Sequence, residues 1–165
     1  MATIITRRTT LLAALTAPLT LAGCASVEQG PDGVFPPRYA IGPALEREQR
    51  LPAEAPILYV VTAPDCPSCF QWHRDKEPAF ESSEARARLR VVHLHSRSIK
   101  FGSGRPETWP ADTRWVRDAL EDHDVFLVTP LFGLVKGRTY LAGAWGLPDW
   151  EKVMVPAIRA AAGVA

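Results

Sequence analysis

Two cysteines separated by two residues, Cys66 and Cys69, are the side chains of this sequence best suited to chemistry. A C-x-x-C pair that follows a strand and stands at the start of a helix is typical of a redox site. In such a pair the first thiolate attacks a disulfide of a partner, and the second resolves the mixed disulfide. We therefore predict that Cys66 is the attacking nucleophile and that Cys69 is the resolving cysteine.

The elements that must position this pair are a strand before it and a helix after it. The apolar run over residues 57–61 predicts a buried strand. A helix start gathers backbone N–H groups without helical partners and carries a partial positive charge, which stabilises a thiolate. We expect Cys66 on the exposed rim of the first turn, with Cys69 one turn deeper on the same side. Asp65 opposes this effect, because a carboxylate beside Cys66 disfavours its thiolate.

A second segment carries a proline in an unusual place. Residues 125–135 form an apolar run that contains Thr129 and Pro130, although proline removes a hydrogen-bond donor from a strand. Together with the C-x-x-C pair, this pattern resembles the thioredoxin-like superfamily over roughly residues 57–162. In that superfamily a cis-proline opens the strand that faces the active-site cysteines. The resemblance implies this position for Pro130, and it implies that Thr129 and Pro130 present backbone to an extended substrate segment.

The remaining pattern is that of an α/β protein. Strand-like and helix-like segments alternate, with a second strand over residues 89–95, a helix around residues 115–120 and a terminal helix from Pro148. The resemblance implies the same fold, a thioredoxin-like domain whose central mixed β-sheet is flanked by helices on both faces. We expect Pro156 to kink the terminal helix. The long connection over residues 96–110 either borders the site or a partner, or is a surface insert.

The sequence also departs from the usual thioredoxin pattern. A buried carboxylate six residues before the first cysteine is common in thioredoxins, and Val60 stands at that position here. Asp-Cys-Pro-Ser-Cys replaces the usual Trp-Cys-Gly-Pro-Cys. With these differences, the sequence resembles a specialised exported relative of the thioredoxins. Residues 69–73 (Cys-Phe-Gln-Trp-His) are similar to the same segment of small periplasmic thioredoxins associated with sulfur-oxidation clusters.

The N-terminal part of the chain predicts export. Arg7 and Arg8 precede an apolar stretch over residues 11–22, which is shorter than the about 20 residues that span a bilayer. We predict a signal peptide of the lipoprotein or twin-arginine type over residues 1–23.

The signal peptide is expected to end at Cys24. Leu-Ala-Gly-Cys, which ends at this residue, resembles the lipobox of bacterial lipoproteins and implies that Cys24 carries a lipid anchor. The alternative is ordinary signal cleavage, with Cys24 lost or left free. We predict a flexible tether over residues 24–40 and the thioredoxin-like domain over residues 41–165. The expected location is the periplasm, at the membrane.

The predicted function is therefore that of a periplasmic thiol–disulfide oxidoreductase that exchanges disulfides with client proteins. It requires no bound cofactor, because the dithiol is itself the redox group, and its direction is left open. A membrane redox partner is expected to exchange electrons with it. The net charge of +1 and the absence of a basic run give no indication of nucleic-acid binding.

Two alternatives from other classes remain. One is a copper or zinc carrier that uses Cys66, Cys69 and a histidine, with His73, His93 and His95 as candidate ligands. Their spacing is not that of a zinc finger, and we predict no metal site. The other is a non-catalytic binding module on a thioredoxin scaffold, in which the two cysteines form a fixed structural disulfide.

Overall fold

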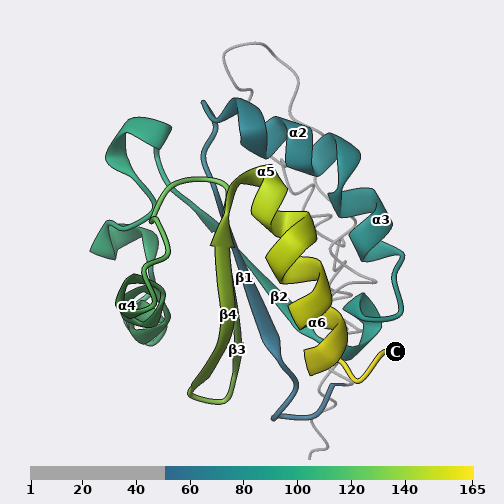
Figure 1. The fold of residues 1–165 in the computed structure, drawn as a ribbon. Helices are drawn as coiled ribbons and strands as arrows, with labels where there is room; N and C mark the ends of the chain where they lie inside the picture. The colour runs from purple at the N-terminus through teal and green to yellow at the C-terminus, as the bar shows by residue number, and fades with distance from the viewer. Residues whose placement is uncertain (1–50) are drawn as a thin grey trace, which may run out of the picture. The chain divides into compact units, whose positions relative to one another are not determined.

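The computed structural model describes residues 51–165 (Figure 1). The predicted signal peptide, the tether, the lipidation of Cys24 and the first ten residues of the predicted domain lie outside the described residues. They stay predictions.

A mixed four-stranded sheet forms the centre of the described region, with the strand order β2-β1-β3-β4. The strands are β1 (Ile57–Thr62), β2 (Arg90–His95), β3 (Leu131–Lys136) and β4 (Thr139–Trp145). The central strand β1 pairs with β2 in parallel and with β3 in antiparallel orientation, and β3 and β4 form an antiparallel hairpin. This mixed sheet is the central element of the α/β architecture that the sequence predicts.

Helices cover both faces of this sheet, as the sequence predicts (Figure 1). The helix α4 (Arg114–Asp122) lies against one face. The other face is covered by α2 (Pro67–Asp75), α3 (Glu77–Glu81), α5 (Gly146–Asp149), a π-helical turn η4 (Trp150–Met154) and α6 (Val155–Ala161). Three short 3-10 turns complete the elements: η1 (Arg86–Arg88), η2 (Ile99–Phe101) and η3 (Pro106–Thr108).

The central strand is buried because both of its faces are covered. Leu58 and Val60 point to the side of α2, α3 and α6, whereas Tyr59 and Val61 point to the side of α4. Val60, at the position where thioredoxins often carry a carboxylate, is fully buried in the first of these cores.

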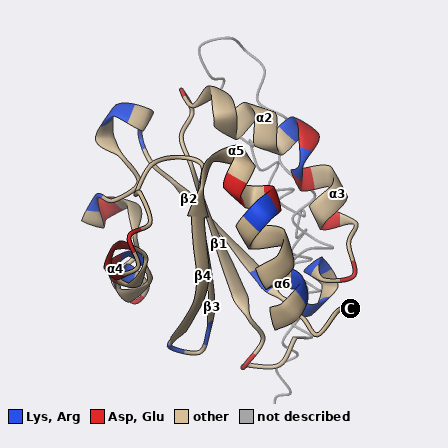
Figure 2. Ribbon diagram, viewed as in Figure 1, with Lys and Arg blue, Asp and Glu red and all other residues tan. Residues whose placement is uncertain are grey.

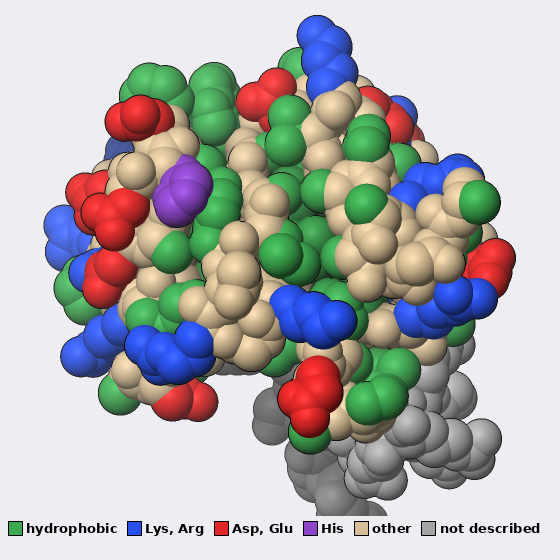
Figure 3. Space-filling view, turned by 60° about the horizontal axis from the view of Figure 1, so that its bottom comes forward, with side chains coloured by type: hydrophobic (Ala, Val, Ile, Leu, Met, Phe, Trp, Pro, Cys, Tyr) green, Lys and Arg blue, Asp and Glu red, His purple; other side chains and the backbone are tan. Residues whose placement is uncertain are grey.

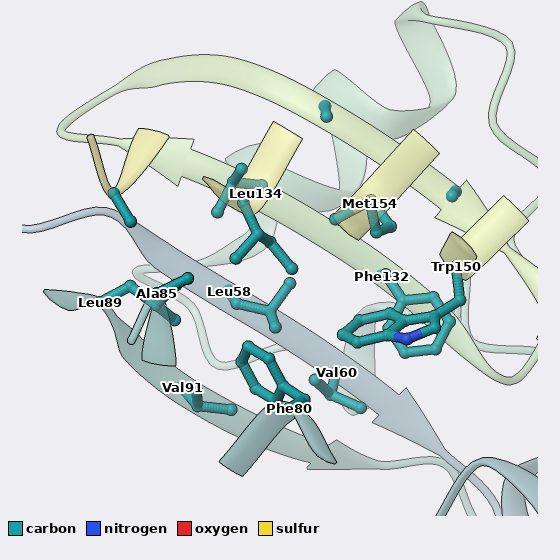
Figure 4. Packing of buried hydrophobic residues seen from close by; sticks show 14 of the residues in the cluster. Leu58, Val60, Phe80, Ala85, Leu89, Val91, Phe132, Leu134, Trp150 and Met154 are labelled. Atoms are coloured by element: carbon teal, nitrogen blue, oxygen red, sulfur yellow. The ribbon is translucent and has the colours of Figure 1, made fainter. Parts of the chain in front are cut away.

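Aromatic side chains fill the core under α2 and the terminal helical segment. The rings of Phe132 and Trp150 lie 4.8 Å apart between centroids (Figure 4). Trp72 of α2 contacts both rings, at 5.5 Å from Phe132 and 5.3 Å from Trp150. Trp72 is therefore a core residue that fixes α2 on the sheet, and its indole N–H has no hydrogen-bond partner in the described part of the chain.

The terminal helical segment has an irregular turn directly before the part that contains Pro156, and the predicted kink stays a prediction. The π-helical turn Trp150–Met154 lies directly before the α6 segment that contains Pro156. Because proline has no N–H to donate to the preceding turn, an irregular turn at this place is expected.

Charges of both signs are distributed along the helices (Figure 2). On the face shown in Figure 3, basic, acidic and hydrophobic side chains are intermixed. Among the helices of residues 51–165, none has the length and apolar character needed to span a membrane.

Candidate functional site

The two cysteines lie where the chain leaves the central strand and enters α2. Cys66 is the N-cap of this helix, with extended backbone angles (φ −101°, ψ 104°), and Pro67 occupies the first helical turn. The Sγ atom of Cys66 accepts a hydrogen bond from the N–H of Cys69 at 3.2 Å. The two residues form a disulfide, with their Cα atoms 5.2 Å apart. The predicted strand, turn and helix around the pair are confirmed.

The prediction that Cys66 is exposed is wrong. Cys66 is 0 % exposed and Cys69 is 2 % exposed, and both pack with Ala63 in a small apolar cluster. Disulfide exchange requires a thiolate to reach a sulfur, so a reaction of this pair requires a local movement of the residues that cover it.

The peptide bond between Thr129 and Pro130 is cis, as the resemblance implies. Pro130 is buried and directly precedes β3, whose first residue Leu131 pairs with Val61 near the end of β1. The carbonyl of Pro130 accepts a hydrogen bond from the N–H of Gly146 at 2.9 Å. Pro130 therefore lies at the same end of the sheet as the turn that leads to the cysteines.

The apolar residues before this proline do not form a strand. The strand β3 begins at Leu131, directly after Pro130, which is where the resemblance places its start. Thr129 is 6 % exposed, and its hydroxyl has no hydrogen-bond partner among residues 51–165. The substrate-binding role of Thr129 and Pro130 stays a prediction.

Asp65 connects the cysteine turn to the long loop over residues 96–110. Its carboxylate accepts hydrogen bonds from the hydroxyl of Ser98 and, at 2.7 Å, from the N–H of Ile99. These hydrogen bonds, that of Ser98 above all, lower the pKa of Asp65. Of the two interpretations of this loop, the structure favours the one in which it borders the site.

The same loop is held by buried groups of its own. The indole N–H of Trp109 donates to the carbonyl of Ser103 at 2.7 Å, and both residues are buried. The hydroxyl of the buried Ser96 donates to the carbonyl of Ser98 at 3.0 Å. The loop is thus a folded unit, which the irregular spacing of its residues does not reveal.

Two histidines lie beside one buried carboxylate, and a third contacts the end of β1. Glu77 is 1 % exposed, and its Oε2 accepts a hydrogen bond from Nδ1 of His73 at 2.6 Å. Nε2 of His93 lies 3.8 Å from Oε1 of the same carboxylate. Nδ1 of His95 lies 3.1 Å from the hydroxyl of Thr62, the last residue of β1. This pair is not among the predictions made from the sequence, although the i, i+4 spacing of His73 and Glu77 is a local signal that could indicate it.

These contacts bear on the metal-carrier alternative. Within residues 51–165, no group of three or more His, Cys, Asp or Glu side chains is arranged to hold a metal ion. The histidines are engaged with Glu77 and Thr62, whereas Cys66 and Cys69 are bonded to each other. The two cysteines are therefore paired with each other and not with these histidines.

Large apolar side chains are exposed beside the cysteine turn and the cis-proline. Phe70, which follows Cys69, is 44 % exposed. Phe126 and Trp145 are 67 % and 42 % exposed, and their rings meet edge to face with centroids 5.7 Å apart. Trp145 pairs with Leu131, the residue after Pro130. These aromatic residues give this end of the sheet an apolar surface.

Comparison with known proteins gives two structural similarities. No protein-family model and no curated protein matches the sequence. The reduced form of the periplasmic thioredoxin SoxS from Paracoccus pantotrophus has 19 % identity and a TM-score of 0.42, over 66 % of this chain and 96 % of that chain. A DsbH oxidoreductase has 16 % identity and a TM-score of 0.41, over 74 % of this chain and 80 % of that chain.

Proposed function

We propose that this protein is a thiol–disulfide oxidoreductase whose redox group is the Cys66–Cys69 pair. The observation that carries the proposal is the position of the disulfide, at the N-terminus of α2 and at the sheet end that Pro130 also occupies. A disulfide at a helix start is suited to exchange, because the helix end stabilises the negative charge of a leaving thiolate.

The proposed reaction follows from this geometry. A client thiolate attacks the Cys66 sulfur, the Cys66–Cys69 bond breaks, and the sulfur of Cys69 leaves as a thiolate. A second client thiolate then attacks the client sulfur of the mixed disulfide, and Cys66 leaves. The client loses two electrons and forms a disulfide, while the protein gains two electrons and becomes a dithiol. The reverse steps reduce a client disulfide, with Cys66 as the attacking group.

The surroundings of the pair support a polypeptide as the client. Exposed Phe70, Phe126 and Trp145 offer apolar contacts at this end of the sheet, and we propose that Thr129 and Pro130 present backbone to the client segment. Export to the periplasm, a lipid anchor on Cys24 and a membrane redox partner belong to the same proposal. Export and the anchor are supported by the sequence of residues 1–24, and the membrane partner would supply or remove the electrons that the exchange requires.

One observation favours a second candidate function. Because both sulfurs are buried, the disulfide has the accessibility of a structural crosslink, and the domain would then act as a binding module. The two candidates differ in whether the disulfide exchanges with thiols at all.

Trapping of mixed disulfides tests the proposal directly. In a Cys69→Ser variant, a client captured on Cys66 cannot be released by the second cysteine, so we expect covalent complexes that dithiothreitol dissolves. A Cys66→Ser variant, in which the buried Cys69 remains, is the matched control and should capture far less. If neither variant forms mixed disulfides, and the wild type does not exchange with a small neutral disulfide, the binding module is the better account.

The membrane location has its own test. A Cys24→Ser variant should move from the membrane fraction to the soluble fraction of the periplasm, because the anchor requires this thiol. An unchanged distribution would contradict lipidation at Cys24 without affecting the redox proposal.

A further inference from the structure

We propose that a hollow in the loop over residues 96–108 binds a carboxylate of the disulfide-bearing partner, next to the redox pair. The inference rests on the proposed function, and it names the chemical class of partner that the site prefers: disulfides that carry an acidic group close to the reacting sulfur.

The hollow is formed by one continuous part of the chain. Its lining residues are Ser96, Arg97, Phe101, Arg105, Glu107 and Thr108, and its volume is about 70 Å³. Pockets that enclose a whole small-molecule ligand usually measure about 300–1,000 Å³. The hollow is therefore of a size to accept one functional group of a larger partner.

The charges around the hollow favour an anion. Two arginines line it and one glutamate opposes them. Arg97 forms no salt bridge with any residue of the described part of the chain, whereas Arg105 lies 3.5 Å from Glu107. A guanidinium group presents several N–H donors in a fork that matches a carboxylate. Arg97 is thus available to an incoming carboxylate, and Arg105 can share its donors between Glu107 and that group.

The position of Arg105 is fixed by the wall of the hollow. Its guanidinium lies 5.0 Å from the centroid of the Phe101 ring, a cation–π contact that holds the group over an exposed aromatic side chain. The pKa of Glu107 is lowered, chiefly by a hydrogen bond with its own backbone, and further by Arg105 and Arg97. Both arginines therefore contribute positive charge to the same hollow.

The hollow is tied to the redox pair by the hydrogen bonds of Asp65. Ser98 and Ile99, which bond to this carboxylate, stand between Arg97 and Phe101 in the chain. Asp65 is the residue directly before Cys66. A partner whose acidic group occupies the hollow is therefore bound by the same loop segment that is hydrogen-bonded to the cysteine turn.

Three small disulfides of different charge test this inference. The reduced full-length protein is mixed with one of three disulfides, and the rate of protein oxidation is measured. Glutathione disulfide carries carboxylates and has a net negative charge, bis(2-hydroxyethyl) disulfide is neutral, and cystamine is cationic. We expect the wild type to react faster with glutathione disulfide than with cystamine.

The variants assign this preference to the hollow. An Arg97→Gln, Arg105→Gln double variant should react about three- to tenfold more slowly with glutathione disulfide than the wild type. This is the effect expected from the loss of two solvent-accessible ion pairs. Its rate with the neutral disulfide should remain within about twofold, because the cysteines are unchanged. A Lys136→Gln, Arg138→Gln double variant removes the same charge at the β3–β4 turn, at the other end of these strands, and should retain the wild-type preference.

The outcomes separate the two claims. If the wild type does not oxidise with the neutral disulfide, the proposed function fails. The hollow is then still tested by titration calorimetry of glutathione disulfide against the oxidised wild type and the oxidised double variant. If exchange occurs but the arginine variant keeps the wild-type preference, or if both double variants lose it equally, the hollow is not the recognition site.

Discussion

The carboxylate of Asp65 accepts a hydrogen bond from the N–H of Ile99, at 2.7 Å and across 34 positions of the sequence. Asp65 precedes Cys66, and Ile99 begins the 3-10 turn η2 of the long loop. The negative charge that the sequence places beside Cys66 is therefore engaged by donors of another segment. This contact joins the loop to the turn that carries the cysteine pair.

The first prediction concerns this contact. Asp65→Asn keeps the shape of the side chain but weakens its hydrogen bonds to Ile99 and Ser98, because a neutral amide oxygen is a weaker acceptor than a carboxylate. We expect faster hydrogen exchange at the Ile99 amide and unchanged exchange in the strands. Asp122→Asn, at the exposed end of α4, is the control. Equal protection of Ile99 in the wild type and in Asp65→Asn would contradict the anchoring role.

The second prediction concerns the buried carboxylate of Glu77. Glu77→Ala removes the partner of His73 from a site that is 1 % exposed. We expect the free energy of unfolding in urea to fall by about 3 kcal/mol, because the substitution removes a buried, hydrogen-bonded side chain and leaves its space empty. Glu121→Ala, on the exposed surface of α4, should change it by no more than about 0.5 kcal/mol. Similar changes in the free energy of unfolding for both variants would show that the Glu77 carboxylate and its contact with His73 do not stabilise the fold.

The third prediction is a pH dependence of stability. Desolvation lowers the pKa of His93, against an opposing effect of Glu77, and also lowers the pKa of His95, with His73 adding to the effect. The folded state then binds protons less readily than the unfolded chain, whose histidines titrate near 6.5. Their contribution to stability is therefore complete above that pH and is lost as the pH falls through the lowered values.

Urea unfolding at a series of pH values measures this dependence. The decline below pH about 6.5 should be smaller in a His93→Asn, His95→Asn variant, because its titrating groups are gone. His123→Asn, at the exposed end of α4, should keep the wild-type slope. Identical slopes in all three proteins would assign the decline to other groups.

The fourth prediction concerns the close approach of α4 to the hairpin. A Cβ added to Gly143 would lie 2.3 Å from a methyl carbon of Leu120 and 2.8 Å from the hydroxyl of Tyr140. At Gly133 the nearest atom, again of Leu120, would lie 3.3 Å away. Overpacking of this kind costs about 1–3 kcal/mol, and we expect Gly143→Ala to lower the midpoint of thermal unfolding more than Gly133→Ala. The reverse order would contradict the packing described for α4.

Local sequence patterns predicted the elements that carry the cysteines. A continuous apolar run specifies a strand that is buried on both faces, and residues 57–61 formed β1 accordingly. The cis bond at Pro130 was implied by resemblance alone, as was the start of a strand directly after it. That strand, β3, begins at Leu131.

Contacts between distant segments were beyond the reach of these patterns. The burial of Cys66 depends on how the residues around the turn pack, and its position at a helix start predicts the opposite. The bonds from Asp65 to Ser98 and Ile99, and the approach of His93 to Glu77, join segments whose spacing has no local period. Three-dimensional packing alone brings these groups together.

The reduction potential of the Cys66–Cys69 pair tests the central claim most directly. The oxidised and reduced forms are equilibrated with glutathione or dithiothreitol buffers, and the fraction of disulfide is measured after acid quenching and thiol labelling. A redox-active pair should titrate reversibly between about −270 and −120 mV, the range of thiol–disulfide oxidoreductases. A potential below about −300 mV, without exchange on the time scale of minutes, is typical of a structural disulfide and would contradict the account.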